Sequence, residues 1–142
     1  MSTSLIEELR QLLGSAVVAD DAEALTAHAG DKWSAVHEPE VVVFAQSTDQ
    51  VSRLLRFASK KKIPVTGRGA GYGHVGGCVP VRGGIALSLA RTNRIKEDHF
   101  AGALAIVEPG VITGDRQDAV RAQKLFDQPD PAGMNECKTR GK

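Results

Sequence analysis

The sequence predicts an α+β fold in which a mixed sheet is flanked by helices. The first indication is the β-branched run at residues 41–45, which predicts a strand that is covered on both faces. An amphipathic helix pattern opens at Ser47, and residues 63–66 then resume an extended path. We expect this strand–helix–strand unit to form a parallel pair of strands.

Capping signals define the helices. Ser4 and Glu7 have capping-box spacing ahead of an apolar periodicity that stops at Gly14, which predicts an N-terminal helix. Ser47 and Gln50 repeat that spacing at the start of the second amphipathic helix, which ends in a run of lysines. We also expect a short helix over residues 21–29 and a weaker one over residues 114–124.

Two more strands are expected towards the C-terminus. Residues 84–89 and 103–107 are apolar runs, and the polar stretch 91–102 between them predicts a connection. Residues 126–133 contain Pro129 and Pro131, so we expect them to be irregular or extended.

Composition and charge exclude several classes of protein. The 142 residues are 42% hydrophobic and 25% charged, as expected of one globular unit, and the net charge of +1 offers no basic field for nucleic acid. No run approaches the about 18 apolar residues of a membrane span, and the N-terminus lacks the apolar region of a signal peptide, so we expect a cytoplasmic protein. Cys78 and Cys137 give no metal-ligand spacing, and we expect no metal site.

The glycine-rich segment GRGAGYGHVGG, residues 67–77, is the main candidate for function. It contains G-x-G-x-x-G from Gly71 to Gly76 after a predicted strand, so a dinucleotide fingerprint is the first hypothesis. That fingerprint requires a helix directly afterwards. The following residues are rich in glycine and contain Pro80, and at about 1 kcal/mol per glycine and 3 per interior proline they do not form one. The NTPase phosphate loop is excluded because no Lys-Ser or Lys-Thr pair follows.

Two interpretations of this segment stay open from the residues alone. Glycines permit positive φ and close approach, so consecutive backbone N–H groups can converge on a phosphate, with Arg68 available to hold the loop or to balance charge. The alternative is a glycine-rich hairpin with tight turns and no ligand.

A series of motifs occurs in a characteristic order along the chain: Ser47-x-x-x-Val51, then residues 63–65, 68–77, 83–89, 93–95, 108–111 and 130–132. In this order they resemble the N-terminal part of the FAD-binding domain of the vanillyl-alcohol oxidase, or PCMH-type, flavoprotein family. Within that family the sequence is most similar to FAD-linked oxidases of the glycolate oxidase GlcD and D-lactate dehydrogenase type. The resemblance implies an N-terminal helical segment over residues 1–38, a partial PCMH-type FAD-binding domain over 39–137, and a divergent basic tail over 138–142.

The resemblance also implies a cofactor and its binding residues. In some relatives a histidine attaches FAD covalently, and the position of that histidine corresponds to Tyr72 in this sequence and not to His74. Noncovalent FAD is therefore expected. The implied cofactor-binding residues are Arg68, Gly69, Ala70, Gly71, Tyr72, Gly73, His74, Gly76 and Gly77 of the loop, together with Pro109, Gly110, Val111, Asp130, Pro131 and Ala132.

The implied function is FAD binding as the N-terminal part of an FAD-dependent oxidoreductase that acts on a small 2-hydroxy acid. Relatives continue after Cys137 with further FAD-binding strands and a substrate domain, so the chain is expected to be truncated and to hold no catalytic residue of its own. Its expected partners are FAD and a separately encoded remainder of the oxidase. The alternatives are an inactive truncated gene product and a small nucleotide- or anion-binding protein without redox activity.

Overall fold

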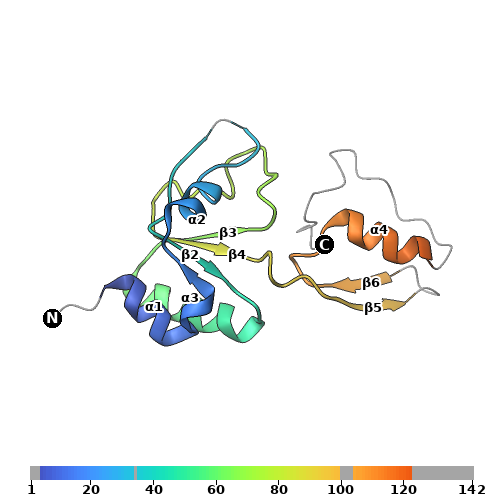
Figure 1. Ribbon diagram of the computed structural model, residues 1–142, viewed down its shortest axis with the longest axis horizontal. Helices are drawn as coiled ribbons and strands as arrows, with labels where there is room; N and C mark the ends of the chain where they lie inside the picture. Colours follow the sequence, from blue (N-terminus) through green and yellow to red (C-terminus); the bar gives the residue numbers. More distant parts are fainter. Residues whose placement is uncertain (1–3, 34, 100–103, 123–142) are drawn as a thin grey trace.

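A four-stranded sheet in the order β1-β2-β4-β3 organises the N-terminal part of the chain (Figure 1). The structure is a computed structural model that describes residues 4–33, 35–99 and 104–122. β2, β4 and β3 run parallel, and β1 pairs antiparallel with β2, which confirms the predicted mixed sheet. The strands are β1 (Val18–Ala19), β2 (Val41–Phe44), β3 (Val65–Arg68) and β4 (Ile85–Ser88).

The parallel direction of β2 and β3 is as predicted, but the prediction that they pair with each other is wrong. β4 lies between them and pairs with both. All residues of β4 are buried, whereas those of β3 are partly or fully exposed. The more apolar strand therefore takes the central position, where both faces and both edges are covered.

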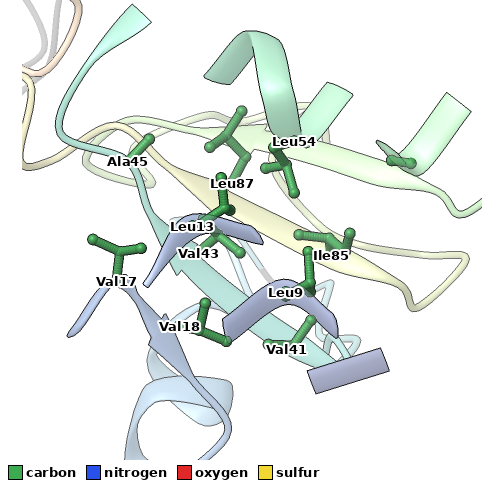
Figure 2. Packing of buried hydrophobic residues seen from close by; sticks show 11 residues of the cluster. Leu9, Leu13, Val17, Val18, Val41, Val43, Ala45, Leu54, Ile85 and Leu87 are labelled. Atoms are coloured by element: carbon green, nitrogen blue, oxygen red, sulfur yellow. The ribbon is translucent and has the colours of Figure 1, made fainter. Parts of the chain in front are cut away.

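Two helices, α1 (Leu5–Leu13) and α3 (Thr48–Lys61), cover one face of this sheet. Figure 2 shows Leu9 of α1 and Leu54 of α3 packed against alternate strand residues of the sheet, and both leucines are fully buried. Because strand side chains alternate between faces, the residues between them face the opposite side. The buried strand residues in this core are Val18, Val41, Val43, Ile85 and Leu87.

The helices begin where the capping signals predict. Ser4 Oγ accepts from Glu7 N at 3.3 Å and Glu7 Oε2 accepts from Ser4 N at 3.0 Å, which confirms the capping box of α1. At α3, Ser47 Oγ accepts from Gln50 N at 3.3 Å. The Gln50 side chain, however, accepts from Gln46 N at 2.8 Å, so the return bond reaches one residue further back than a capping box requires.

The opposite face of the sheet lies towards α2 (Ala22–Ala27), the predicted short helix. Asp21 caps this helix, since its Oδ1 accepts from Ala24 N at 2.9 Å. The ring of His28, just after α2, makes a T-shaped contact with the ring of Phe44 in β2, with the ring centroids 5.1 Å apart.

Beyond the carboxyl end of β4, a separate two-stranded antiparallel sheet joins β5 (Ile95–His99) and β6 (Leu104–Val107). The prediction of a polar connection throughout residues 91–102 is wrong for β5. This strand is charged, with no apolar alternation to reveal it, and pairing with β6 defines it. Helix α4 (Thr113–Ala122) follows. The expected features at residues 126–133 and 138–142 lie outside the described residues.

An ion pair between Arg94 and Glu108 holds together the end of the second sheet at which β5 starts and β6 stops. Glu108, which is buried, accepts from Arg94 N at 3.0 Å and from Arg94 Nη2 at 2.9 Å. These hydrogen bonds hold the pKa of Glu108 below its usual value. The bond to the backbone and the bond to the guanidinium together join the start of β5 to the end of β6. None of the helices in the described ranges has the length and apolar character needed to cross a membrane.

Substitutions of two adjacent leucines in α3 test which side of this helix faces the core. Leu54 is fully buried and Leu55 is 45% exposed. We expect Leu54→Ala to lower the free energy of unfolding by about 2–5 kcal/mol, because it leaves a cavity beneath α3. The matched change Leu55→Ala is expected to cost less than about 1 kcal/mol. Urea unfolding followed by circular dichroism measures both, and equal losses would contradict this packing.

Candidate functional site

The glycine loop, residues 69–78, begins where the parallel strands of the sheet end. Phe44, Ser88 and Arg68 are in register at the ends of β2, β4 and β3. Just beyond them, Leu89 N donates to Arg68 O at 2.9 Å. Ligands of open α/β sheets bind outside the carboxyl ends of the strands, so the loop occupies the edge at which a binding site is expected.

The amide N–H groups of residues 69–74 are open donors. None of them donates to an acceptor among the residues that the structure describes. Residues 69–71 are partly exposed, and residues 72–74 are exposed. A run of unpaired amides in a glycine loop is the arrangement that receives an anion.

The side chain of Arg68 points into the protein and holds the glycine loop in place. Its guanidinium donates to Gly30 O and, at 3.1 Å, to Ala27 O at the end of α2. Nη1 also lies 3.9 Å from Cys78 Sγ, near the end of the loop. Carbonyls at the C-terminus of a helix lack partners within the helix, and Arg68 provides donors for them. One side chain thus links β3, the end of α2 and both ends of the loop.

Two glycines of the loop have conformations that the contacts around them require. Gly71 has φ +81°, and a Cβ there would lie 2.2 Å from Nη2 of Arg68. Gly76 has φ +74°, and its N–H donates to Asp31 Oδ2 at 3.0 Å. The amide of Gly76 is therefore already paired, in contrast to those of residues 69–74. Around Gly77 a Cβ would meet nothing within 4 Å.

Residues 31–33 form one wall of the loop, and the sequence analysis did not identify Asp31 or Lys32 as part of the site. Asp31 accepts from Trp33 N at 2.8 Å as well as from Gly76. Lys32 N donates to Gly73 O at 3.3 Å, and Lys32 Nζ lies 5.1 Å from the centroid of the Tyr72 ring. Trp33 and His74 make an edge contact with their centroids 6.1 Å apart. Single charged residues in the connection between α2 and β2 carry no periodic signal that would have identified them.

An open depression of about 310 Å³ lies between this wall and the loop, and it is lined by Asp31, Lys32, Gly71 and Tyr72. Its lining combines one lysine and a glycine position that no side chain blocks with one carboxylate, and the open amides of the loop add donors for an anion. In the described part of the chain, no three His, Cys, Asp or Glu side chains gather in a way that could hold a metal.

The Pro109-Gly110-Val111 turn, another predicted part of the site, lies at the same edge of the sheet. Gly110 N donates to Thr92 O at 2.7 Å, and a Cβ at Gly110 would lie 2.1 Å from Leu89 O. Leu89 also bonds to Arg68, so the turn and the start of the loop are joined through one residue. The remaining predicted residues, Asp130, Pro131 and Ala132, lie outside the described residues.

His28 lies beneath the loop, where burial lowers its pKa from 6.5 and the charge of Arg68 acts in the same direction. Its Nδ1–H donates to Ala24 O at 2.9 Å, and this bond opposes the shift. His28 is therefore a neutral packing residue between α2 and the sheet at neutral pH.

Comparison with known proteins identifies the family. The sequence profile of a family described as "FAD binding domain" matches residues 39–141, well over half of the chain. The chain belongs to this family. Its cofactor is FAD, as the sequence resemblance implied.

Curated relatives agree with this assignment. The chain is 38% identical over 96 residues to glycolate oxidase subunit GlcD of Bacillus subtilis, a match that covers 68% of the chain and 20% of that protein. It is 37% identical over 93 residues to D-lactate dehydrogenase of Anaerostipes hadrus, covering 66% of the chain and again 20% of the relative. The chain thus spans about a fifth of the length of these relatives.

Solved structures show the same fold. The chain is similar to p-cresol methylhydroxylase with a TM-score of 0.73 and 27% sequence identity, over 84% of this chain and 24% of that one. The fold is that of the N-terminal part of PCMH-type FAD-binding domains, and the predicted α+β class with a mixed sheet is confirmed.

A substitution at Gly71 tests whether Arg68 holds the glycine loop in place. A Cβ at this position would displace a guanidinium that is held by carbonyls of the α2 end, and φ is positive as well. We expect Gly71→Ala to lower the free energy of unfolding by about 1–3 kcal/mol in urea titrations. Gly77→Ala is the matched control, with an expected change within about 0.5 kcal/mol. A Gly71→Ala variant as stable as the control would mean that Arg68 does not hold the loop in this way.

His28 predicts a pH dependence of stability. Its folded pKa lies below 6.5, so the unfolded chain binds the proton more readily. This contribution to the free energy of unfolding is complete above pH 6.5 and is lost as the pH falls towards the folded pKa. In urea unfolding at about pH 7.5 and about pH 5.5, His28→Asn, which keeps a donor near the Nδ1 position, is expected to lose less stability on acidification than the wild type. Identical acid losses in wild type and His28→Asn would refute the assignment.

Proposed function

We propose that this chain forms the diphosphate-holding part of an FAD-dependent oxidoreductase that acts on a small 2-hydroxy acid. The observation that carries the proposal is the run of open amides at residues 69–74, placed at the carboxyl ends of the parallel strands in a chain of the FAD-binding domain family. A cytoplasmic location, as expected from the sequence, belongs to the same proposal.

In this proposal the loop binds the cofactor through its backbone. The N–H groups of residues 69–74 donate to oxygens of the diphosphate, and hydrogen bonds to an anion are about twice as strong as those between neutral groups. Gly76 and Gly77 shape the return of the loop, while Arg68 keeps the open amides in place from beneath. Preorganised donors do not have to be reoriented when the anion arrives, which favours binding.

The FAD is proposed to bind without a covalent link. Tyr72 occupies the position at which the resemblance places the histidine of covalent relatives, and its ring lies against Lys32. His74 contacts Trp33 instead. FAD, when bound, supplies the hydride acceptor of the reaction, and the residues of this chain bind and orient it.

The substrate class is supported by the relatives. Glycolate and D-lactate, the substrates in the names of the two curated relatives, are both small 2-hydroxy acids. Because the chain spans only 20% of either relative, we assign catalysis and substrate recognition to the parts of those proteins that it does not match. A separately encoded remainder of the oxidase is the proposed partner, and the turn at residues 109–111 and residues 130–132 are proposed to approach the cofactor beside the loop.

A chimera tests this function. In glycolate oxidase subunit GlcD of B. subtilis, the 96-residue matched segment is replaced by the corresponding segment of this chain. We expect the purified chimera to carry stoichiometric FAD, measured by flavin absorbance after denaturation, and we expect glycolate to bleach the flavin under anaerobic conditions. A folded chimera without flavin would overturn the proposal.

Two aspartate substitutions in the loop test whether the diphosphate binds at residues 69–74. Ala70→Asp places a carboxylate among the open amides and is expected to lower FAD affinity at least about tenfold through repulsion of the diphosphate. Val75→Asp adds the same charge to the same loop at a residue that is 92% exposed and outside the run of amides, and we expect a smaller loss. Equal losses of FAD would contradict diphosphate binding at residues 69–74.

A further inference from the structure

A diphosphate at the open amides needs a compensating cation, and Arg68 is not in a position to provide it. Its guanidinium donates to the carbonyls of Ala27 and Gly30 and lies against the position that a Cβ of Gly71 would occupy. The arginine is thus committed to holding the loop from within the protein. The amides themselves carry only partial charges.

Lys32 is the cation at the mouth of the site. Its side chain is exposed, lines the depression together with Gly71 and Tyr72, and forms no ion pair with any carboxylate in the described ranges. Contacts nevertheless define the positions of both its backbone and its ammonium group. The backbone N–H donates to Gly73 O at 3.3 Å, and Nζ lies 5.1 Å from the centroid of the Tyr72 ring, within the range of a cation–π contact.

Asp31 lines the same depression, but its carboxylate makes no ion pair with Lys32 in the described part of the chain. One of its carboxylate oxygens accepts from Trp33 N at 2.8 Å and the other from Gly76 N at 3.0 Å. Both oxygens are thereby oriented towards the backbone of the wall and of the loop. Lys32 therefore remains available to an incoming anion.

We propose that Lys32 is a further binding residue for an organic diphosphate, with its ammonium pairing with the anion that the amides of residues 69–74 receive. The inference rests on the proposed function and adds to it a residue outside the 39–141 segment that the family profile matches. An ammonium acts on phosphate as a point charge, so a position over the Tyr72 ring at the edge of the depression is sufficient. The segment before residue 39 is then part of the cofactor site and not only a support for the sheet.

The only tryptophan of the chain, Trp33, provides the readout because it contacts His74 of the loop. FAD is titrated into the wild type and into Lys32→Met, which keeps the length and apolar stem of the side chain, and the quenching of tryptophan fluorescence gives the dissociation constant. We expect Lys32→Met to weaken FAD binding about tenfold or more, and to make binding less sensitive to salt. Lys32→Arg keeps the charge and is expected to stay within about threefold of the wild type.

Lys60→Met is the matched control, because Lys60 is an exposed lysine in the last turn of α3, at the opposite edge of the sheet from the loop. Its FAD affinity should equal that of the wild type. If the wild type binds FAD and Lys32→Met binds equally well with the same salt dependence, the role of Lys32 is overturned while the proposed function stands. A loss in Lys32→Arg as large as in Lys32→Met would likewise reject a charge-based role. A wild type that binds no FAD would overturn the proposed function, and this inference with it.

Discussion

The contacts of Arg68 are the constraint on which the candidate site depends. Arg68 is the last residue of β3, and its backbone carbonyl accepts from Leu89, so its main chain is fixed by the sheet. Its side chain then reaches the carbonyls at the end of α2, which brings residues 27–33 against the glycine loop. Glycine is favoured at residue 71 because φ is +81° there, and a Cβ would also displace the guanidinium that the carbonyls of Ala27 and Gly30 hold.

In this arrangement, some groups hold the shape of the glycine loop and others, the open amides, are left to bind a ligand. Hydrogen bonds at the margins of the loop, from Gly76 N to Asp31 and from Lys32 N to Gly73 O, hold its shape. The amides of residues 69–74 have no acceptor in the described part of the chain. A buried amide without a partner costs about 1–3 kcal/mol, so an acceptor from a ligand or from solvent is favoured here.

The apolar surface around the loop is consistent with a site that is completed by other groups. Trp33 is 71% exposed and Val75 is 92% exposed, and both lie next to the depression or within the loop itself. In the second sheet, Leu104 and Ile106 of β6 are 57% and 42% exposed. Two-stranded sheets are marginal by themselves. The chain spans about a fifth of the length of these curated relatives, 20% in both cases.

Local patterns in the sequence determined the helices and most strands. Ser4, Asp21 and Ser47 cap helices through bonds to nearby residues. For the glycine loop, local patterns excluded a dinucleotide fingerprint, because a helix could not follow it, and left open whether the loop binds an anion. Only the tertiary structure decided that β4 separates β2 from β3, that the charged β5 is a strand, and that Arg68 points inwards while Lys32 faces the depression. The physical reason is that caps and periodicities depend on neighbours within a few residues. Strand order and the direction of a long charged side chain are set by partners tens of residues away, such as Ala27 and Gly30 for Arg68.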